Sequence, residues 1–179
     1  MQHDRLLLEQ LSAFAPITFE GEVFRATPKS LDPLAPSLSG GRWMFPSAVP
    51  TLYTALEADG ALAEITFHWS MLNPVPSKPA MLHRLRLGAT KSVRLLRGDL
   101  VTLGVDWGHY KELGYTRTQE IGAAVSHLEC NGLIAPSARW ECENVMLFFP
   151  NHVRAEDLAT VVHSELVDWR EWGKAHGFL

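Results

Sequence analysis

Cysteine is scarce in this sequence, whose 179 residues contain only Cys130 and Cys142. Two cysteines are too few for a disulfide scaffold or for a zinc site built from several thiolates. We therefore expect both to be reduced and structural. The eight histidines are scattered without the paired spacing of metal ligands, so we expect no metal site.

An excess of positive charge is also lacking. Sixteen Lys and Arg stand against twenty Asp and Glu, a formal net charge of −4 at pH 7, whereas a nucleic-acid-binding face needs clustered basic residues.

No apolar run approaches the roughly 20 residues of a membrane helix. The apolar run near the N-terminus is short, is interrupted by Glu9 and lacks the basic start of a signal peptide. We expect a cytoplasmic protein that binds neither nucleic acid nor membrane directly.

The common catalytic motifs are missing as well. The sequence has no GxxxxGK[ST], no GxGxxG after a strand, no HExxH and no GxSxG. What is present is globular: 46% of the residues are apolar and 20% are charged, which favours one domain over 1–179 with a sizeable core.

Hydrophobic periodicity predicts a mixed α+β fold. The region 27–41, rich in Pro, Ser and Gly, is predicted to be a loop, and 98–115 is ambiguous, with Trp107 and Tyr110 in a loop. We expect helices at 4–14, 59–69, 116–128 and 169–178, and strands at 18–26, 42–45, 51–55, 81–87, 92–96, 132–136, 144–149 and 159–167.

Polar residues predict where two of these helices begin and end. Asp59 can cap the second helix. Thr116 and Gln119 have the spacing of a capping box. The Asn131-Gly132 pair is a helix C-cap signal.

The chain is organised around residues 40–69, where Arg42, Tyr53 and Glu64 are expected on a strand, a strand edge and a helix that converge. Alanines, leucine and isoleucine surround Glu64, and a carboxylate in such a setting is expected to be paired or functional. We predict that this stretch builds one wall of a pocket for a nucleotide with a labile glycosidic bond. His68, one helical turn after Glu64, has no evident partner and is interpreted as structural.

Five short pieces carry a resemblance to a known family. The pieces are VFRA around Arg25, GGRW around Arg42, LYTAL around Tyr53, ALAE ending at Glu64 and IAPS ending at Ser137. They follow one another over about 20–150 in the order typical of the RES domain family, named for its Arg, Glu and Ser, and the sequence resembles that family.

The resemblance implies an ADP-ribosyltransferase-like fold, with a split central sheet flanked by helices and a cleft for NAD. It also implies a toxin of a bacterial toxin–antitoxin pair, neutralised by an Xre-type helix-turn-helix antitoxin that covers the cleft. NAD would be a substrate rather than a permanently bound cofactor, cleaved at the nicotinamide–ribose bond by hydrolysis or phosphorolysis.

The chemistry of the matching residues suits this activity. Cleavage passes through an oxocarbenium-like state, and the Glu64 carboxylate can bind a ribose hydroxyl and offset the developing positive charge. We expect Glu64, Arg25 and Tyr53 to be catalytic. Nicotinamide is a good leaving group, so no metal is required. Guanidinium groups match phosphate oxygens, and NAD binding is expected from Arg25, Arg42, Tyr53 and Ser137.

Several alternatives stay open. Taken alone, Arg42 could be a surface ion-pair partner, Tyr53 could serve packing, and Ser137 could cap a turn. The ADP-ribose acceptor could be water, phosphate or a protein side chain, which would make the protein an ADP-ribosyltransferase. A non-catalytic binding module of the same fold is a further possibility. The sequence does not decide whether His68, Glu143 or Asn144 lines the cleft.

Overall fold

The structure is a computed structural model that describes residues 3–149 and 154–179. Its centre is a mixed sheet of six strands in the described residues, in the order β1-β2-β5-β4-β3-β6. The strands are β1 (Ile17–Pro28), β2 (Thr51–Ala55), β3 (Ala80–Arg94), β4 (Gly132–Pro136), β5 (Glu143–Phe148) and β6 (Ala159–Val167).

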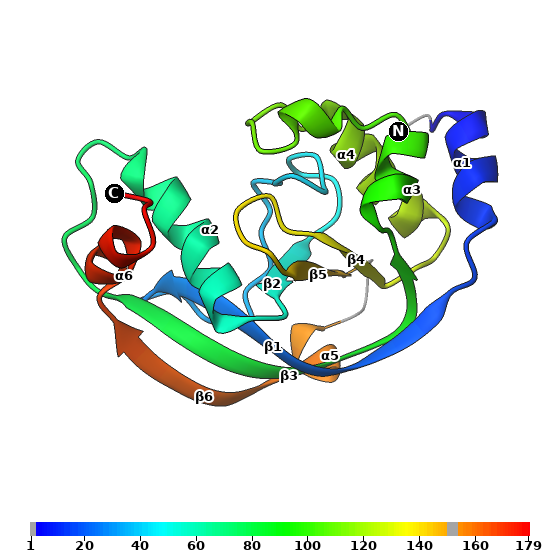
Figure 1. Cartoon of the computed structure of the whole chain (residues 1–179). Helices are drawn as coiled ribbons and strands as arrows, with labels where there is room; N and C mark the ends of the chain where they lie inside the picture. The colour runs from blue at the N-terminus through cyan, green and yellow to red at the C-terminus, as the bar shows by residue number, and fades with distance from the viewer. Residues whose placement is uncertain (1–2, 150–153) are drawn as a thin grey trace.

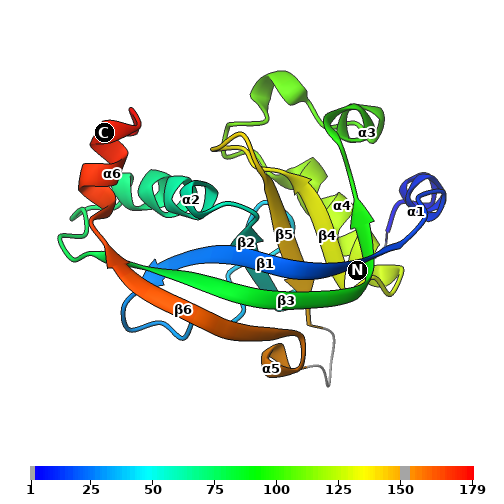
Figure 2. The same cartoon turned by 60° about the horizontal axis from the view of Figure 1, so that its bottom comes forward.

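The sheet consists of two antiparallel halves, β1–β3–β6 and β2–β5–β4 (Figure 2). At one seam β1 meets β2 at Phe24 and Ala55. At the other, β3 runs parallel to β4 over 92–94. The expected α+β fold with a split sheet flanked by helices is therefore confirmed.

The helices are α1 (Arg5–Ser12), α2 (Ala58–Ser70), α3 (Arg97–Thr102), α4 (Thr116–His127), α5 (Ala155–Leu158) and α6 (Trp169–Ala175), with a 3-10 turn at Trp107–His109. Helices cover the two ends of the curved half-sheet β1–β3–β6 (Figure 1). At one end α2 packs against β1 and α6, and at the other α1 packs against α4. No helix in the part of the chain that the structure describes is long and apolar enough to cross a membrane.

Two large apolar clusters hold the sheet. One lies between the halves, where Val23 and Leu85 pack with Leu52, Val145 and Leu147, all fully buried. The other packs α1, α3 and α4 against the outer face of β2–β5–β4. Burial on both faces explains why β5 has the continuous apolar sequence of a central strand.

The predicted break between strands 81–87 and 92–96 is wrong, because β3 is continuous over fifteen residues. Its middle carries Gly88 and polar residues that resemble a turn. Pairing with β1 continues through this region, with Glu20 opposite Gly88 and Phe19 opposite Ala89. A long-range partner therefore overrides the local turn signal.

The predicted strand 42–45 is also wrong. Residues 41–44 form a tight turn closed by the Gly41 N–H donating to the Met44 carbonyl at 3.0 Å. Gly40 enters the turn at φ 77°, a conformation that favours glycine. The turn lies directly on α4, where a Cβ at Gly122 would overlap the Trp43 carbonyl oxygen. Tertiary packing sets this conformation.

The predicted helix caps are replaced by other residues. Glu57 stands at the start of α2, and Asp59 instead accepts a hydrogen bond from the Trp172 indole at 2.9 Å. Thr116 is already inside α4. After α4 the left-handed residue is Glu129, at φ 59°. The ambiguous region 98–115 holds most of α3 and the 3-10 turn, and α5 was not foreseen.

Candidate active site

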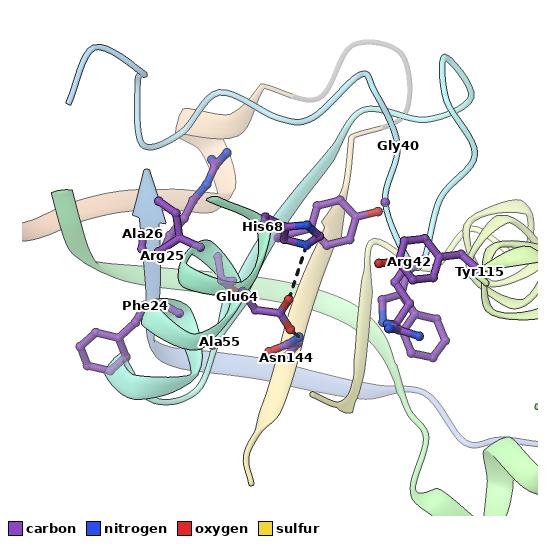
Figure 3. A pocket seen from close by; sticks show the side chains of 16 residues that line it. Phe24, Arg25, Ala26, Gly40, Arg42, Ala55, Glu64, His68, Tyr115 and Asn144 are labelled. Atoms are coloured by element: carbon purple, nitrogen blue, oxygen red, sulfur yellow. Dashed lines mark hydrogen bonds and ion pairs between the residues drawn. The ribbon is translucent and has the colours of Figure 1, made fainter. Parts of the chain in front are cut away.

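A cavity of about 340 Å³ lies between α2, the ends of β1, β2 and β5, and residues 40–43 at the 41–44 turn (Figure 3). This volume is within the usual range of ligand sites. Four of the five residues singled out in the sequence line it: Arg25, Arg42, Tyr53 and Glu64.

Glu64 is the one carboxylate among the described residues that line this cavity. Its neighbours Ala63 and Ile65 are buried, so α2 is anchored on both sides of it. The Glu64 Oε1 atom accepts two hydrogen bonds, from Ser137 Oγ at 3.1 Å and from Asn144 Nδ2 at 3.2 Å. Both donors are neutral, so they fix the orientation of the carboxylate without pairing it with a cation.

Ser137 lies behind Glu64 and is not among the residues that line the cavity. Its hydroxyl donates to Glu64 and accepts from the backbone N–H groups of Arg139 at 3.1 Å and Trp140 at 3.3 Å. A hydroxyl has one proton and two lone pairs. The hydrogen-bonding capacity of Ser137 is therefore filled within the protein, and its role as an NAD ligand stays a prediction.

Arg25 extends from β1 and ties the following loop to the cavity wall. Its Nη1 donates to the carbonyls of Pro33 at 2.7 Å and Ala35 at 2.8 Å. Burial lowers the pKa of Arg25 to about 10, and Asp32 acts in the opposite direction. The guanidinium therefore stays protonated at neutral pH.

Arg42 is held by aromatic rings rather than by a carboxylate. Its guanidinium carbon lies 4.5 Å from the centre of the Tyr115 ring and 4.8 Å from that of Tyr110. Its Nη2 donates to the Glu112 carbonyl at 3.1 Å. Burial lowers the Arg42 pKa, and Tyr110, Tyr115 and Glu64 act in the opposite direction. These contacts orient a positive charge beside the cavity.

Tyr53 brings its ring to the cavity from β2. A Cβ at Gly41 would lie 2.8 Å from the Tyr53 hydroxyl, so the close approach of the turn requires glycine there. The hydroxyl is buried and without a hydrogen-bond partner in the described residues. Burial raises the Tyr53 pKa well above its ordinary value, while the nearby backbone of Trp43 and Met44 acts in the opposite direction. The hydroxyl is therefore protonated at neutral pH.

Of the three residues left undecided, two line the cavity and one does not. His68 and Asn144 line it. The His68 Nε2 atom lies 3.9 Å from Glu64 Oε2, and burial lowers the His68 pKa while Glu64 raises it. Glu143 lines a separate hollow and pairs with Arg94.

Two residues of the site were missed by sequence reasoning. Tyr115 lines the cavity and lies under Arg42, and Tyr110 supports the same guanidinium. Both lie in the ambiguous region 98–115, where no periodic signal marks them. No cluster of three or more potential metal ligands occurs in residues 3–149 and 154–179.

The fold and the cavity define a class: a split-sheet α+β domain with one carboxylate and two arginines around a ligand-sized cavity. The RES domain family matches residues 22–170. The chain belongs to the RES domain family.

Comparison with solved structures supports the same fold. A chain in the crystal structure of the M. tuberculosis MbcT–MbcA toxin–antitoxin complex matches with a TM-score of 0.81 and 17% identity. The match covers 97% of this chain and 98% of the other. No curated protein matches the sequence.

Proposed function

We propose that this protein is an NAD-consuming enzyme and the toxin of a toxin–antitoxin pair. NAD would bind in the cavity, and Glu64 would act on the nicotinamide–ribose bond. The observation that carries the proposal is the Glu64 carboxylate, which lines the cavity and is held by two neutral donors rather than neutralised by a strong cation.

Glu64 suits a reaction in which positive charge develops on ribose. As nicotinamide departs, charge grows at the ribose C1 and ring oxygen. A fixed carboxylate nearby stabilises that charge more in the transition state than in the bound substrate. The Oε2 atom is the one left for this task, because Ser137 and Asn144 both donate to Oε1.

The arginines and tyrosines suit the rest of the substrate. Arg25 and Arg42 supply positive charge for the pyrophosphate, and contacts within the protein hold both guanidinium groups. The rings of Tyr53 and Tyr115 provide faces against which an aromatic base or a sugar can pack. Phosphate contacts exist in both the ground and transition states, so the arginines should contribute to binding.

An Xre-type antitoxin that covers the cavity is the expected partner. Family membership supports this, as does the likeness to a chain of a toxin–antitoxin complex. A carboxylate or chain terminus on the antitoxin could occupy the phosphate position beside Arg25 and Arg42. Mapping the interface by hydrogen exchange tests this, and an interface that leaves the cavity open would contradict occlusion.

The enzymatic proposal is tested by incubating the purified protein with NAD, with and without phosphate, and identifying the products. We expect free nicotinamide in both cases or only with phosphate, and the companion product identifies the acceptor. Intact NAD under all conditions, with folded protein, would rule out NAD cleavage. ADP-ribose attached to a protein would instead indicate transfer.

A further inference from the structure

Asn144 occupies a central position in the sheet. It lies on β5, opposite Ala55 of β2 and Ala135 of β4. Its side chain lines the cavity and points to Glu64, with Nδ2 3.2 Å from Glu64 Oε1 (Figure 3). Asn144 therefore connects the rigid sheet to the carboxylate on α2.

This arrangement leaves the other end of the amide unsatisfied. A carboxylate can only accept, so the atom facing Glu64 must be the amide nitrogen. The Asn144 Oδ1 atom is then buried, with no hydrogen-bond partner in the described residues. Burying an unpaired amide oxygen costs free energy that a hydrocarbon side chain of similar size would avoid. Fold stability alone does not explain an asparagine here.

Asn144 and Ser137 act on the same oxygen from different elements. Ser137 reaches Oε1 from the turn after β4, and Asn144 reaches it from β5. Two donors in different directions fix both the position and the rotation of the carboxylate. Removing either donor leaves a single contact about which the carboxylate can rotate, which would move Oε2 from its place 3.9 Å from His68 Nε2.

We infer that Asn144 is a positioning residue for cleavage of the nicotinamide–ribose bond, acting through Glu64. This role rests on the proposed function. Asn144 holds Oε1 so that Oε2 faces the ribose, and it does so without a positive charge that would neutralise Glu64. The unpaired Oδ1 is the cost in stability that accompanies this geometry.

The test compares Asn144→Leu with a matched control, Asn131→Leu. Asn131 is structural: its Oδ1 accepts from the Lys91 backbone N–H at 3.0 Å, at the seam between β3 and β4. Single-turnover cleavage of NAD, NAD affinity and thermal unfolding are measured for both variants. Asn144→Ala is measured alongside, because alanine is smaller than leucine and the protein can accommodate it without rearranging neighbouring side chains.

We expect Asn144→Leu to lower the single-turnover rate by about tenfold, the effect of losing a hydrogen bond to a charged group. Its unfolding temperature should be unchanged or higher, and its NAD affinity should stay within about twofold of the wild type. Asn131→Leu should show the opposite pattern, with lower stability and an unchanged rate. In a Glu64→Gln background, Asn144→Leu should add less than about twofold.

Each other outcome overturns the inference. A wild-type rate in Asn144→Leu and Asn144→Ala would show that Glu64 needs no support from the sheet. A full tenfold loss on top of Glu64→Gln would show that Asn144 does not act through Glu64. If the wild type itself releases no nicotinamide, the proposed function fails first and the role of Asn144 fails with it.

Discussion

Two carboxylates close to Asn144 have opposite surroundings. Glu64, in the cavity, accepts hydrogen bonds from neutral Ser137 and Asn144. Glu143, in the neighbouring hollow, forms a two-point ion pair with Arg94, with Nε 2.8 Å from Oε1. The Glu143 side chain is 18% exposed and that of Glu64 is 32% exposed, so burial does not distinguish the carboxylate that we propose as catalytic.

The difference lies in the partners. A carboxylate paired with arginine has its charge neutralised inside the protein, whereas one held by neutral donors retains charge for a ligand. Glu64 therefore fits a role in catalysis, and Glu143 fits a structural role.

Expression in bacteria without an antitoxin should arrest growth and deplete NAD, because the cavity would turn over a central cofactor. Glu64→Gln should restore growth, since a preorganised electrostatic contact is worth about a hundredfold to a thousandfold in rate. Glu143→Gln should remain toxic. Colony counts and cellular NAD after induction measure this, and normal growth with soluble wild-type protein would contradict the toxin proposal.

The arginine of the cavity and the arginine of the hollow should also differ in their effect on NAD binding. Arg25→Ala removes a cavity cation and should weaken NAD binding by about tenfold to a hundredfold, the value of a hydrogen bond to a charged group. Arg94→Ala removes the partner of Glu143 and should leave NAD affinity unchanged. Calorimetric titration with NAD measures both in a Glu64→Gln background, where cleavage is slow, and equal affinities for the two variants would remove Arg25 from the site.

At acid pH, protonated His68 should become a cationic partner of Glu64. Burial lowers the His68 pKa, so His68 is neutral at pH 7 and becomes protonated only below its ordinary value of about 6.5. The imidazolium would then stand 3.9 Å from Glu64 Oε2 and partly neutralise it.

A unit charge at this distance in water is worth about 1 kcal/mol. The cleavage rate should therefore fall by about fivefold more at acid pH in the wild type than in His68→Gln. The pH–rate profiles of the two proteins measure this. Superimposable acid limbs would show that His68 does not influence Glu64.

The smallest effect is expected from the surface ion pair itself. Glu143→Gln should lower the free energy of unfolding by about 1 kcal/mol or less, because the Arg94 side chain is half exposed and solvent screens the pair. Urea denaturation with and without added salt measures this. A loss of several kcal/mol would mean that the Arg94–Glu143 ion pair makes a large contribution to the stability of the fold.

The sequence predicts the contents of the cavity better than its geometry. The resemblance to the RES domain family singles out Arg25, Arg42, Tyr53, Glu64 and Ser137, and the first four line the cavity. The periodic elements α2, α4, β2 and β5 also lie close to their predicted ranges. Local hydrophobic patterns are enough to predict these helices and strands, because each of them buries one or both of its faces.

What the sequence could not predict depends on contacts between distant residues. The 41–44 turn takes its shape from packing on Gly122 of α4. The three hydrogen bonds of Ser137 arise from the turn that follows β4. Tyr115 reaches Arg42 only because the tertiary fold brings the chain before α4 to the 41–44 turn. The spacing of residues in the sequence does not indicate these contacts.

Stabilisation by Glu64 of the charge that would develop on ribose is tested most directly by measuring NAD affinity and single-turnover cleavage for Glu64→Gln and Glu143→Gln in parallel. Glu64→Gln should bind NAD nearly as well as the wild type but cleave it about a hundredfold to a thousandfold more slowly, whereas Glu143→Gln should match the wild type in both. Cleavage at the wild-type rate by Glu64→Gln would contradict the account and make Glu64 a structural carboxylate.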